Sequence, residues 1–240
     1  MEAIVLAGGL GTRLRSRLSG VPKPMAQVGG RPFLEILLGQ LGDAGFRRTL
    51  LSVGYLGNVI ADHFGSRWRG MLLDYVVEDS PLGTGGAIRR ALPLVEEPSA
   101  FVLNGDTWLD ADYPAMDDLH RSSQVDLTLA LSLVPDMARY GGVDLNGDRV
   151  AGFIEKGRTG AGWINAGVYI MSRNFSWPVN LAEKFSFETD VLFPLLPALR
   201  HAVFLSHGYF LDIGVPEDLD RAQTELANLK RAPATEAGSH

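Results

Sequence analysis

The sequence contains no cysteine among its 240 residues, which excludes disulfide bonds, thiolate metal ligands and a thiol nucleophile. It also has no long apolar run. The stretch Leu127–Val134 is interrupted by Thr and Ser and is far shorter than the roughly 18 apolar residues that a membrane span requires. The first residues lack the basic segment of a secretory signal and lead directly into a strand pattern. We therefore expect a cytoplasmic protein without a membrane segment.

Positive charge is scarce as well. The chain has 22 Lys and Arg residues against 28 Asp and Glu residues, for a net charge of −6. This balance argues against nucleic-acid binding, although it leaves room for a local basic site. With 46% hydrophobic and 21% charged residues, the chain can bury a sizeable core. We expect a single domain over residues 1–231 and a flexible polar tail over 232–240, while the oligomeric state stays open, a homodimer included.

Strand and helix patterns alternate through the first half of the chain. Strand patterns cover Ala3–Leu6, Arg48–Val53, Leu72–Glu78 and Ala100–Asn104, and helical patterns cover Phe33–Ala44, Leu56–Phe64 and Gly85–Ala91. This alternation predicts an α/β fold, with a Rossmann-like and mostly parallel sheet flanked by helices.

The second half is richer in strand patterns. These cover Asp126–Leu133, Gly142–Asp144, Val150–Glu155, Trp163–Met171 and Ala202–Leu205, with a hairpin turn at Asn146-Gly147. They predict an antiparallel extension of the sheet. A final helix should begin at Pro216 and run to about Leu229.

A glycine-rich loop follows the first strand, in the sequence Leu6-Ala7-Gly8-Gly9-Leu10-Gly11-Thr12-Arg13-Leu14. Glycines at this place let the backbone approach a ligand closely, and consecutive N–H groups can bind phosphate oxygens. Arg13 adds a guanidinium that can donate two hydrogen bonds to an anion. Leu14 does not fit the Rossmann dinucleotide pattern, and the P-loop sequence Gly-Lys-Ser/Thr is absent.

Lys23 stands between two prolines, in Val21-Pro22-Lys23-Pro24-Met25. We expect a stiff, extended segment that directs its ammonium group at an anion. The glycine loop followed by Pro-Lys-Pro-Met resembles the signature of the sugar-1-phosphate nucleotidyltransferases. Further motifs with the same resemblance are Pro81–Ala87, Asn104–Asp106, Phe153–Lys156, Ile164–Tyr169, Phe187–Asp190 and Leu211–Glu217.

The resemblance implies roles for individual residues. The catalytic residues would be Arg13, Lys23, Asp106 and Asp212, and the two aspartates would bind Mg²⁺. The nucleotide-binding residues would be Leu6, Ala7, Gly8, Gly9, Gly11, Thr12, Arg13, Lys23, Glu78, Pro81, Gly83, Thr84, Gly105 and Asp106. The antiparallel extension would bind the sugar through Glu155, Lys156, Asn165, Gly167 and Glu188. Gly157 departs from the pattern, because many relatives have proline there.

The chemistry of nucleotidyl transfer is consistent with these residue types. Both reactants are anions, so cations and a carboxylate-bound divalent metal can position them and neutralise their charge. The attacking phosphate is already ionised at pH 7, and no general base is needed.

Glu78 ends the strand pattern before Pro81-Leu82-Gly83-Thr84, and the family resemblance implies that a residue at this position contacts the base. A carboxylate can accept both hydrogens of the Watson–Crick edge of guanine, which favours GTP. Alternatively, backbone groups near Gly83–Gly86 read the base.

Within the family, the residues of the two glycine loops and the Lys23-Pro24-Met25-Ala26 segment resemble most closely the D-glycero-α-D-manno-heptose 1-phosphate guanylyltransferases. The product would be a GDP-heptose for a bacterial surface polysaccharide. Mannose 1-phosphate guanylyltransferases are the nearest alternative. A non-catalytic nucleotide-sensing subunit is disfavoured because the four charged catalytic positions are all present, and the five histidines lack the spacing of a zinc site.

Overall fold

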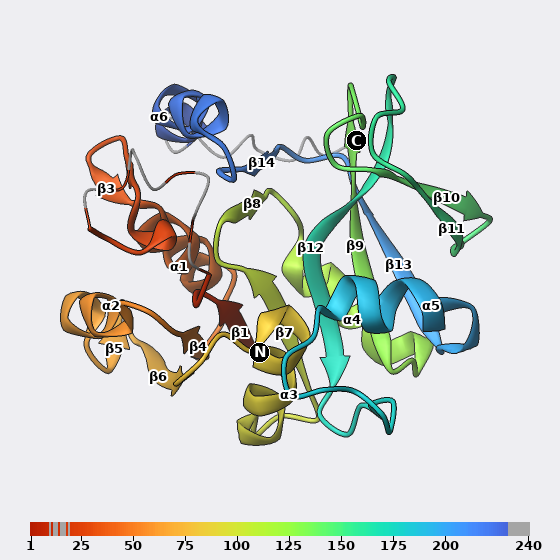
Figure 1. Ribbon diagram of the computed structural model, residues 1–240, viewed down its shortest axis with the longest axis horizontal. Coiled ribbons are helices and arrows are strands. Elements are labelled where there is room, and N and C mark those ends of the chain that lie inside the picture. The colour runs from red at the N-terminus through yellow and green to blue at the C-terminus, as the bar shows by residue number, and fades with distance from the viewer. Residues whose placement is uncertain (10, 12–13, 15–17, 19, 230–240) are drawn as a thin grey trace, which may run out of the picture.

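The computed structural model describes residues 1–9, 11, 14, 18 and 20–229, and an eight-stranded sheet crosses its centre (Figure 1). In spatial order the strands are β13 (His201–Ser206), β9 (Leu127–Val134), β12 (Gly162–Ser172), β7 (Ser99–Asn104), β1 (Glu2–Leu6), β4 (Arg48–Val53), β6 (Met71–Val77) and β5 (Arg67–Trp68). The tail predicted for 232–240 lies outside the described residues.

The central strands are apolar on both faces of the sheet. In β1, the consecutive residues Ala3, Ile4 and Val5 are all fully buried, as is typical of a parallel strand with a covered surface on either side. β1 runs parallel to β4 and to β7, and β4 runs parallel to β6. The predicted α/β class with a mostly parallel sheet is confirmed.

The predicted antiparallel extension is present in β12, and only β13 differs from the prediction in direction. β12 is antiparallel to both β7 and β9, but β13 runs parallel to β9. β12 runs opposite to β9, and the chain turns again before β13. β13 therefore has the direction of β9 and pairs with its outer edge. The hairpin predicted around Asn146-Gly147 is present as β10 (Gly142–Asn146) and β11 (Arg149–Ile154), but it forms a separate two-stranded sheet.

Helices cover both faces of the sheet. They are α1 (Phe33–Asp43), α2 (Gly57–Phe64), α3 (Gly83–Ala91) and α4 (Tyr113–Ser123). The last helix, α6 (Pro216–Leu229), packs against the start of α1 and against β14 in a separate hydrophobic cluster. α1, α2 and α4 share one hydrophobic cluster with the central strands, and α3 shares the cluster on the opposite face. A helical segment, formed by η4 (Glu188–Leu192), α5 (Phe193–Leu195) and η5 (Leu196–Ala198), packs on the same face as α3.

The sequence prediction missed α4. The helix begins after Asp112, whose carboxylate accepts a hydrogen bond of 2.9 Å from the N–H of Ala115, and Pro114 lies in its first turn. Its buried residues Tyr113, Met116 and His120 recur at helical spacing. α4 connects β7 to β9 and brings the chain back to the edge where both strands begin.

Short elements complete the fold. These are the 3-10 turns η2 (Lys23–Met25) and η3 (Leu92–Leu94) and the strands β2 (Gln27–Val28), β3 (Arg31–Pro32), β8 (Thr107–Leu109) and β14 (Phe210–Asp212). Lys23 therefore begins a 3-10 turn, and Pro22 directly before it is extended. The expectation of an extended segment at Lys23 was wrong, because the backbone N–H of Ala26 bonds back to the Lys23 carbonyl.

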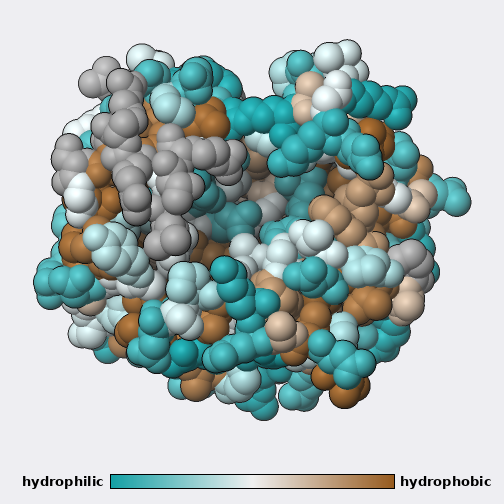
Figure 2. Space-filling view, viewed as in Figure 1, coloured by the Kyte–Doolittle hydropathy of each residue, from teal (hydrophilic) through white to brown (hydrophobic). Residues whose placement is uncertain are grey.

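The carboxyl ends of β1, β4, β6 and β7 meet at one edge of the sheet, where ligands bind in open α/β folds. Figure 2 shows a hollow in the upper centre of the molecule, with hydrophilic residues along much of its wall. Across the described part of the chain, no helix is both long and apolar enough to cross a bilayer.

Candidate active site

Two aspartates meet where β8 pairs with β14. Asp106 directly precedes β8, and Asp212 ends β14 opposite Thr107. The N–H of Ile213 donates to the Asp106 carbonyl at 2.9 Å, which fixes the two segments to each other. Lys23 forms an ion pair with the Asp106 carboxylate. Three residues from separate parts of the sequence, the first and last of them more than 180 positions apart, thus form one charged cluster.

The electrostatics of this cluster favour a cation. Burial, together with the negative charge of Asp106, raises the pKa of Asp212, although Lys23, Arg139 and the Gly214 N–H act in the opposite direction. A divalent cation between the two carboxylates would relieve both effects. In the residues that the structure describes, no three His, Asp or Glu side chains are grouped as metal ligands. Two carboxylates that leave positions for phosphate oxygens and water match the way Mg²⁺ binds at phosphate-transfer sites.

A cavity of about 480 Å³ opens beside the cluster, between the glycine loop and the start of α3. Nine predicted nucleotide-binding residues line this cavity, which we call the nucleotide cavity. These are Leu6, Gly8, Gly9, Gly11, Glu78, Pro81, Gly83, Thr84 and Asp106. Loops after β1, β6 and β7 therefore form one cavity, as expected for strands whose carboxyl ends meet at the same edge.

Other predicted nucleotide-binding residues lie behind this wall. Ala7 is buried, and its N–H donates to the Ser52 carbonyl. Gly105 packs against Leu6, where a Cβ atom would meet the Leu6 carbonyl oxygen at 2.6 Å. Thr12 and Arg13 lie outside the described residues.

Glu78 is held at the cavity by two hydrogen bonds. Ser52 Oγ donates to Oε1 at 2.9 Å, and the N–H of Leu82 donates to Oε2 at 3.0 Å. Gly8 packs so closely that a Cβ atom there would meet Glu78 Oε1 at 2.8 Å. A carboxylate offers about four lone-pair positions, so each oxygen of Glu78 can accept one more hydrogen bond.

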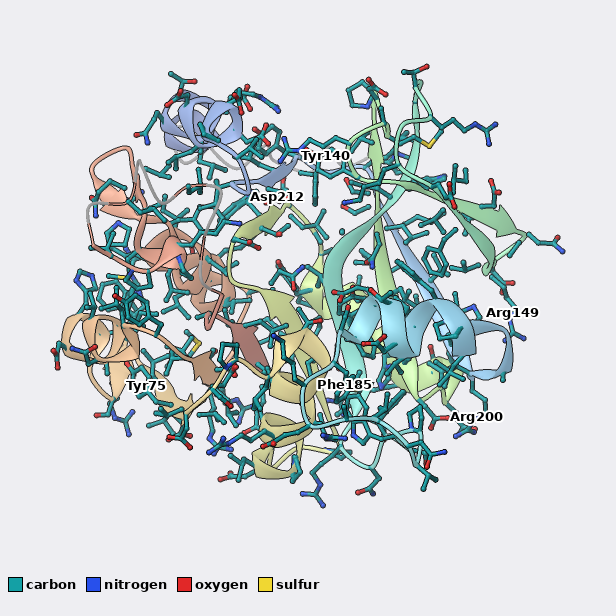
Figure 3. All side chains as sticks on the ribbon, viewed as in Figure 1. Tyr75, Tyr140, Arg149, Phe185, Arg200 and Asp212 are labelled. Carbon is teal, nitrogen blue, oxygen red and sulfur yellow. The ribbon has the colours of Figure 1, made fainter. Side chains whose placement is uncertain are left out.

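Two further cavities lie on the side of β12. The larger one, of about 420 Å³, is lined by Lys156, Asn165, Gly167, Glu188 and Asp212, and we call it the larger sugar-side cavity. The other, of about 320 Å³, is lined by Glu155, Lys156 and Asn165. All five predicted sugar-binding residues therefore line this region. The two cavities share Tyr140 and Phe193 in their walls, and Asn104 lines both the larger one and the nucleotide cavity. Figure 3 shows Tyr140 and Asp212 close together.

A register shift in β12 shapes this wall. The pairing of β12 with β9 is irregular between Asn165 and Tyr169, and Gly167 has a φ of +67°. A Cβ atom on Gly167 would meet Asn104 Nδ2 at 2.3 Å. Glycine thus satisfies the left-handed backbone and the close contact with β7 at the same position.

Glu188 connects the two sides of the site. Its Oε2 accepts hydrogen bonds from Thr84 Oγ1 at 2.7 Å and from Ser186 Oγ at 3.1 Å. The buried Tyr169 hydroxyl lies 3.5 Å from Oε1 and accepts a hydrogen bond of 2.7 Å from Asn165 Nδ2. Burial and the Glu188 charge raise the pKa of Tyr169 well above its ordinary value, so this hydroxyl stays protonated.

Sequence reasoning missed several residues of the site. Asn104 and Lys184 line the nucleotide cavity, Arg139 and Tyr140 line the larger sugar-side cavity, and Ser52 holds Glu78. Asn104 ends a predicted strand beside Asp106, which was a usable signal. The others are joined to the site by contacts between distant segments, which a single sequence does not reveal.

Comparison with known proteins places the chain in a family. The family model described as "Nucleotidyl transferase" matches residues 2–228. The chain belongs to the nucleotidyl transferase family. Among its relatives, D-glycero-alpha-D-manno-heptose 1-phosphate guanylyltransferase of Aneurinibacillus thermoaerophilus is 43% identical, over 94% of this chain and 98% of the relative. Mannose-1-phosphate guanylyltransferase of Mycobacterium tuberculosis is 37% identical, over 94% of this chain and 64% of the relative.

A solved structure has the same fold as this chain. The crystal structure of HddC from Yersinia pseudotuberculosis superimposes with a TM-score of 0.81 at 38% identity, covering 94% of this chain and 99% of HddC. HddC has also been crystallised in complex with GMP-PN. The sequence-based assignment to the nucleotidyltransferases is confirmed.

Proposed function

We propose that this protein transfers GMP from GTP to a sugar 1-phosphate, with D-glycero-α-D-manno-heptose 1-phosphate as the expected acceptor. The products are a GDP-sugar and pyrophosphate. We place the reaction in the cytoplasm and assign the GDP-sugar to the synthesis of a surface polysaccharide, capsule or lipopolysaccharide.

One observation carries this proposal. The nucleotide cavity and the larger sugar-side cavity share the wall at Asn104, and Asp106 lines the first cavity and Asp212 the second. A nucleotide and a sugar phosphate can therefore meet at the charged cluster. The 43% identity over nearly the whole length of a heptose 1-phosphate guanylyltransferase supports the choice of base and sugar.

The chain's own residues position and neutralise the reactants. The guanine faces Glu78, and the triphosphate extends along the glycine loop toward Lys23, with Arg13 as a second cation. A phosphate oxygen of the sugar 1-phosphate attacks the α-phosphorus of GTP. A new P–O bond forms while the bond to the pyrophosphate oxygen breaks, and the electron pair leaves with pyrophosphate. The reaction relies on orientation and charge stabilisation, since the nucleophile is already an anion.

Asp106 and Asp212 would hold the divalent cation, which we propose to be Mg²⁺. When bound, it would neutralise charge on the phosphates as a Lewis acid. Lys23 already pairs with Asp106, so a cationic group adjoins the place where negative charge accumulates.

A second acceptor is supported by the comparison with the mycobacterial enzyme. At 37% identity this relative acts on mannose 1-phosphate, as its name states. Mannose 1-phosphate is therefore the first alternative acceptor to be tested beside the heptose.

The test is a matrix of pyrophosphate-release assays. GTP, ATP, UTP and dTTP are each combined with the 1-phosphates of heptose, mannose, glucose and N-acetylglucosamine. We expect the highest kcat/KM for GTP with the heptose, loss of turnover in EDTA, and recovery on addition of Mg²⁺. A preference for UTP or dTTP, or for a gluco-configured sugar, would overturn the assignment.

A variant of Asp212 tests whether turnover depends on the proposed metal site. Asp212→Asn should lower kcat by roughly 100-fold or more, as when a preorganised electrostatic group is removed from a transition state. Asp118→Asn, an exposed position on α4, is the matched control and should retain full activity. Circular dichroism checks that both variants are folded. Near-normal turnover of Asp212→Asn would mean that the cation is bound elsewhere.

A further inference from the structure

Arg139 lies in the loop between β9 and β10, at the end of the larger sugar-side cavity that adjoins Asp212. Its Nη1 forms an ion pair with Asp218, and its Nη2 lies 3.7 Å from Asp212 Oδ2. The guanidinium carbon is 5.1 Å from the centre of the Tyr140 ring, within the range of a cation–π contact. The guanidinium is thus positioned by two neighbours and points its second nitrogen toward the reaction centre.

The loop that carries Arg139 is itself well held. The N–H groups of Tyr140 and Gly141 donate to the Met137 carbonyl, and the N–H of Met137 donates to the Gly160 carbonyl at 3.0 Å. These hydrogen bonds fix the backbone on both sides of Arg139. The side chain therefore starts from a defined position, which reduces the entropic cost of ordering it on a ligand.

Asp218 anchors Arg139 without fully neutralising it. The Asp218 side chain is buried, and its Oδ1 also lies 3.2 Å from Arg221 Nη1. Two guanidinium groups therefore share this one carboxylate. The other carboxylate near Arg139, that of Asp212, would be engaged by a divalent cation bound to Asp106 and Asp212. The positive charge at Nη2 would then be available to an incoming anion.

We propose that Arg139 binds the phosphate group of the sugar 1-phosphate, through the guanidinium edge that carries Nη2. This inference rests on the proposed function. Among the described residues that line the larger cavity, the cationic side chains are Arg139 and Lys156. The attacking phosphate must reach the α-phosphate beside Asp212, and of the two cations it is Arg139 that forms an ion pair with that aspartate, at 3.7 Å.

The chemistry of the group fits this role. A guanidinium presents parallel N–H donors that match the spacing of two phosphate oxygens. Tyr140 supports its face and Asp218 holds Nη1. Nη2 faces Asp212, and it becomes available to a phosphate once that aspartate binds the cation. Asp218 is a positioning residue in this scheme, because it acts through Arg139 and is not itself in contact with the substrate.

The competing interpretation is that Arg139 only ties the β9–β10 loop to α6. A structural tie would act on stability and on both substrates alike. A phosphate ligand acts on the sugar phosphate alone. The two interpretations therefore differ in how the KM values of GTP and of the sugar 1-phosphate respond.

The experiment compares Arg139→Gln and Arg139→Lys with Arg121→Gln, which removes an exposed arginine from an ion pair with Asp117 on α4. In Arg139→Gln we expect the KM of the sugar 1-phosphate to rise about 10- to 100-fold, as for loss of a charged hydrogen bond. The KM of GTP should stay within about twofold. Arg139→Lys should be intermediate because it keeps the charge without the paired donors, and Arg121→Gln should behave as wild type.

A binding measurement separates this inference from the proposed function. Saturation-transfer NMR, with Mg²⁺ present and GTP absent, records binding of mannose 1-phosphate and of free mannose to wild type and to Arg139→Gln. If Arg139→Gln loses binding of mannose 1-phosphate but not of free mannose, the result supports the role of Arg139. This holds even if the wild-type protein turns over none of the sugars in the assay matrix. Equal rises in both KM values, or unchanged binding of the sugar phosphate by a folded Arg139→Gln, would overturn it.

Discussion

At the scale of single residues, the site depends on side chains held by partners that are distant in the sequence. Glu78 was recognisable from its place after a strand, but the serine that orients it lies 26 residues earlier on β4. Ser52 is fully buried and its hydroxyl donates to the carboxylate that faces the nucleotide cavity. A small polar residue in a buried strand is an ordinary feature of a sequence, so its role becomes visible only when the strands are paired.

Removing this hydroxyl should weaken recognition of GTP. In Ser52→Ala, Glu78 keeps the Leu82 N–H but loses one of its two fixed hydrogen bonds. We expect kcat/KM for GTP to fall about 3- to 10-fold, in line with one ordinary hydrogen bond, with little change in the KM of the sugar phosphate. Thr49→Val removes another buried hydroxyl from β4 and serves as the control. Unchanged GTP kinetics in Ser52→Ala would indicate that backbone groups near Gly83–Gly86 read the base.

At the scale of elements, the sequence predicted the strands and helices with strong periodicity and missed those defined by context. The central strands were evident because they are continuous apolar runs. α4 was missed because charged and polar residues surround its three buried residues and weaken the helical pattern. The predicted direction of β13 was wrong because long-range pairing sets the order of the strands. The same dependence on long-range contacts holds at the start of β1. There Glu2 accepts hydrogen bonds from the N–H groups of Glu96 and Glu97 and from Arg48 of β4.

This junction predicts a dependence of stability on pH. Burial acts to raise the pKa of Glu2, but the hydrogen bonds from Glu97, Arg48 and Glu96 outweigh it and lower the pKa. Because the pKa of Glu2 is lower in the folded state than in the unfolded state, its charge stabilises the fold at pH values above the unfolded-state pKa. This stabilisation is lost as the pH falls through the folded-state pKa. Glu2→Gln should therefore reduce the free energy of unfolding by about 1–3 kcal/mol at pH 7. In urea titrations, the difference from wild type should narrow only below the ordinary glutamate value of 4.5. A difference that stays constant from pH 7 to acid would refute a role for the charge.

At the scale of the whole molecule, the fold class and the order of the motifs were predictable, whereas the way the motifs assemble was not. The aspartates of β8 and β14 were assigned from their motifs, and their adjacency comes from the pairing of two three-residue strands. Arg139 gave no local signal, because its significance lies in contacts with Asp212 of β14 and Asp218 of α6, more than 70 positions further along the sequence. The arrangement of the two substrate cavities around the end of β7 is likewise a property of the complete sheet.

The wall that the two cavities share at Asn104 bears on how the enzyme responds to its own product. In the proposed reaction a GDP-sugar would span both cavities at once. Its two halves are linked, so the second half would bind at a high effective concentration. Product inhibition should follow, and should regulate flux without a separate regulatory site. We expect GDP-sugar to compete with GTP and also to raise the apparent KM of the sugar 1-phosphate, whereas GMP should compete with GTP alone. Initial-rate measurements at varied concentrations of each substrate test this, and inhibition by GDP-sugar indistinguishable from that by GMP would show that the product does not occupy both cavities.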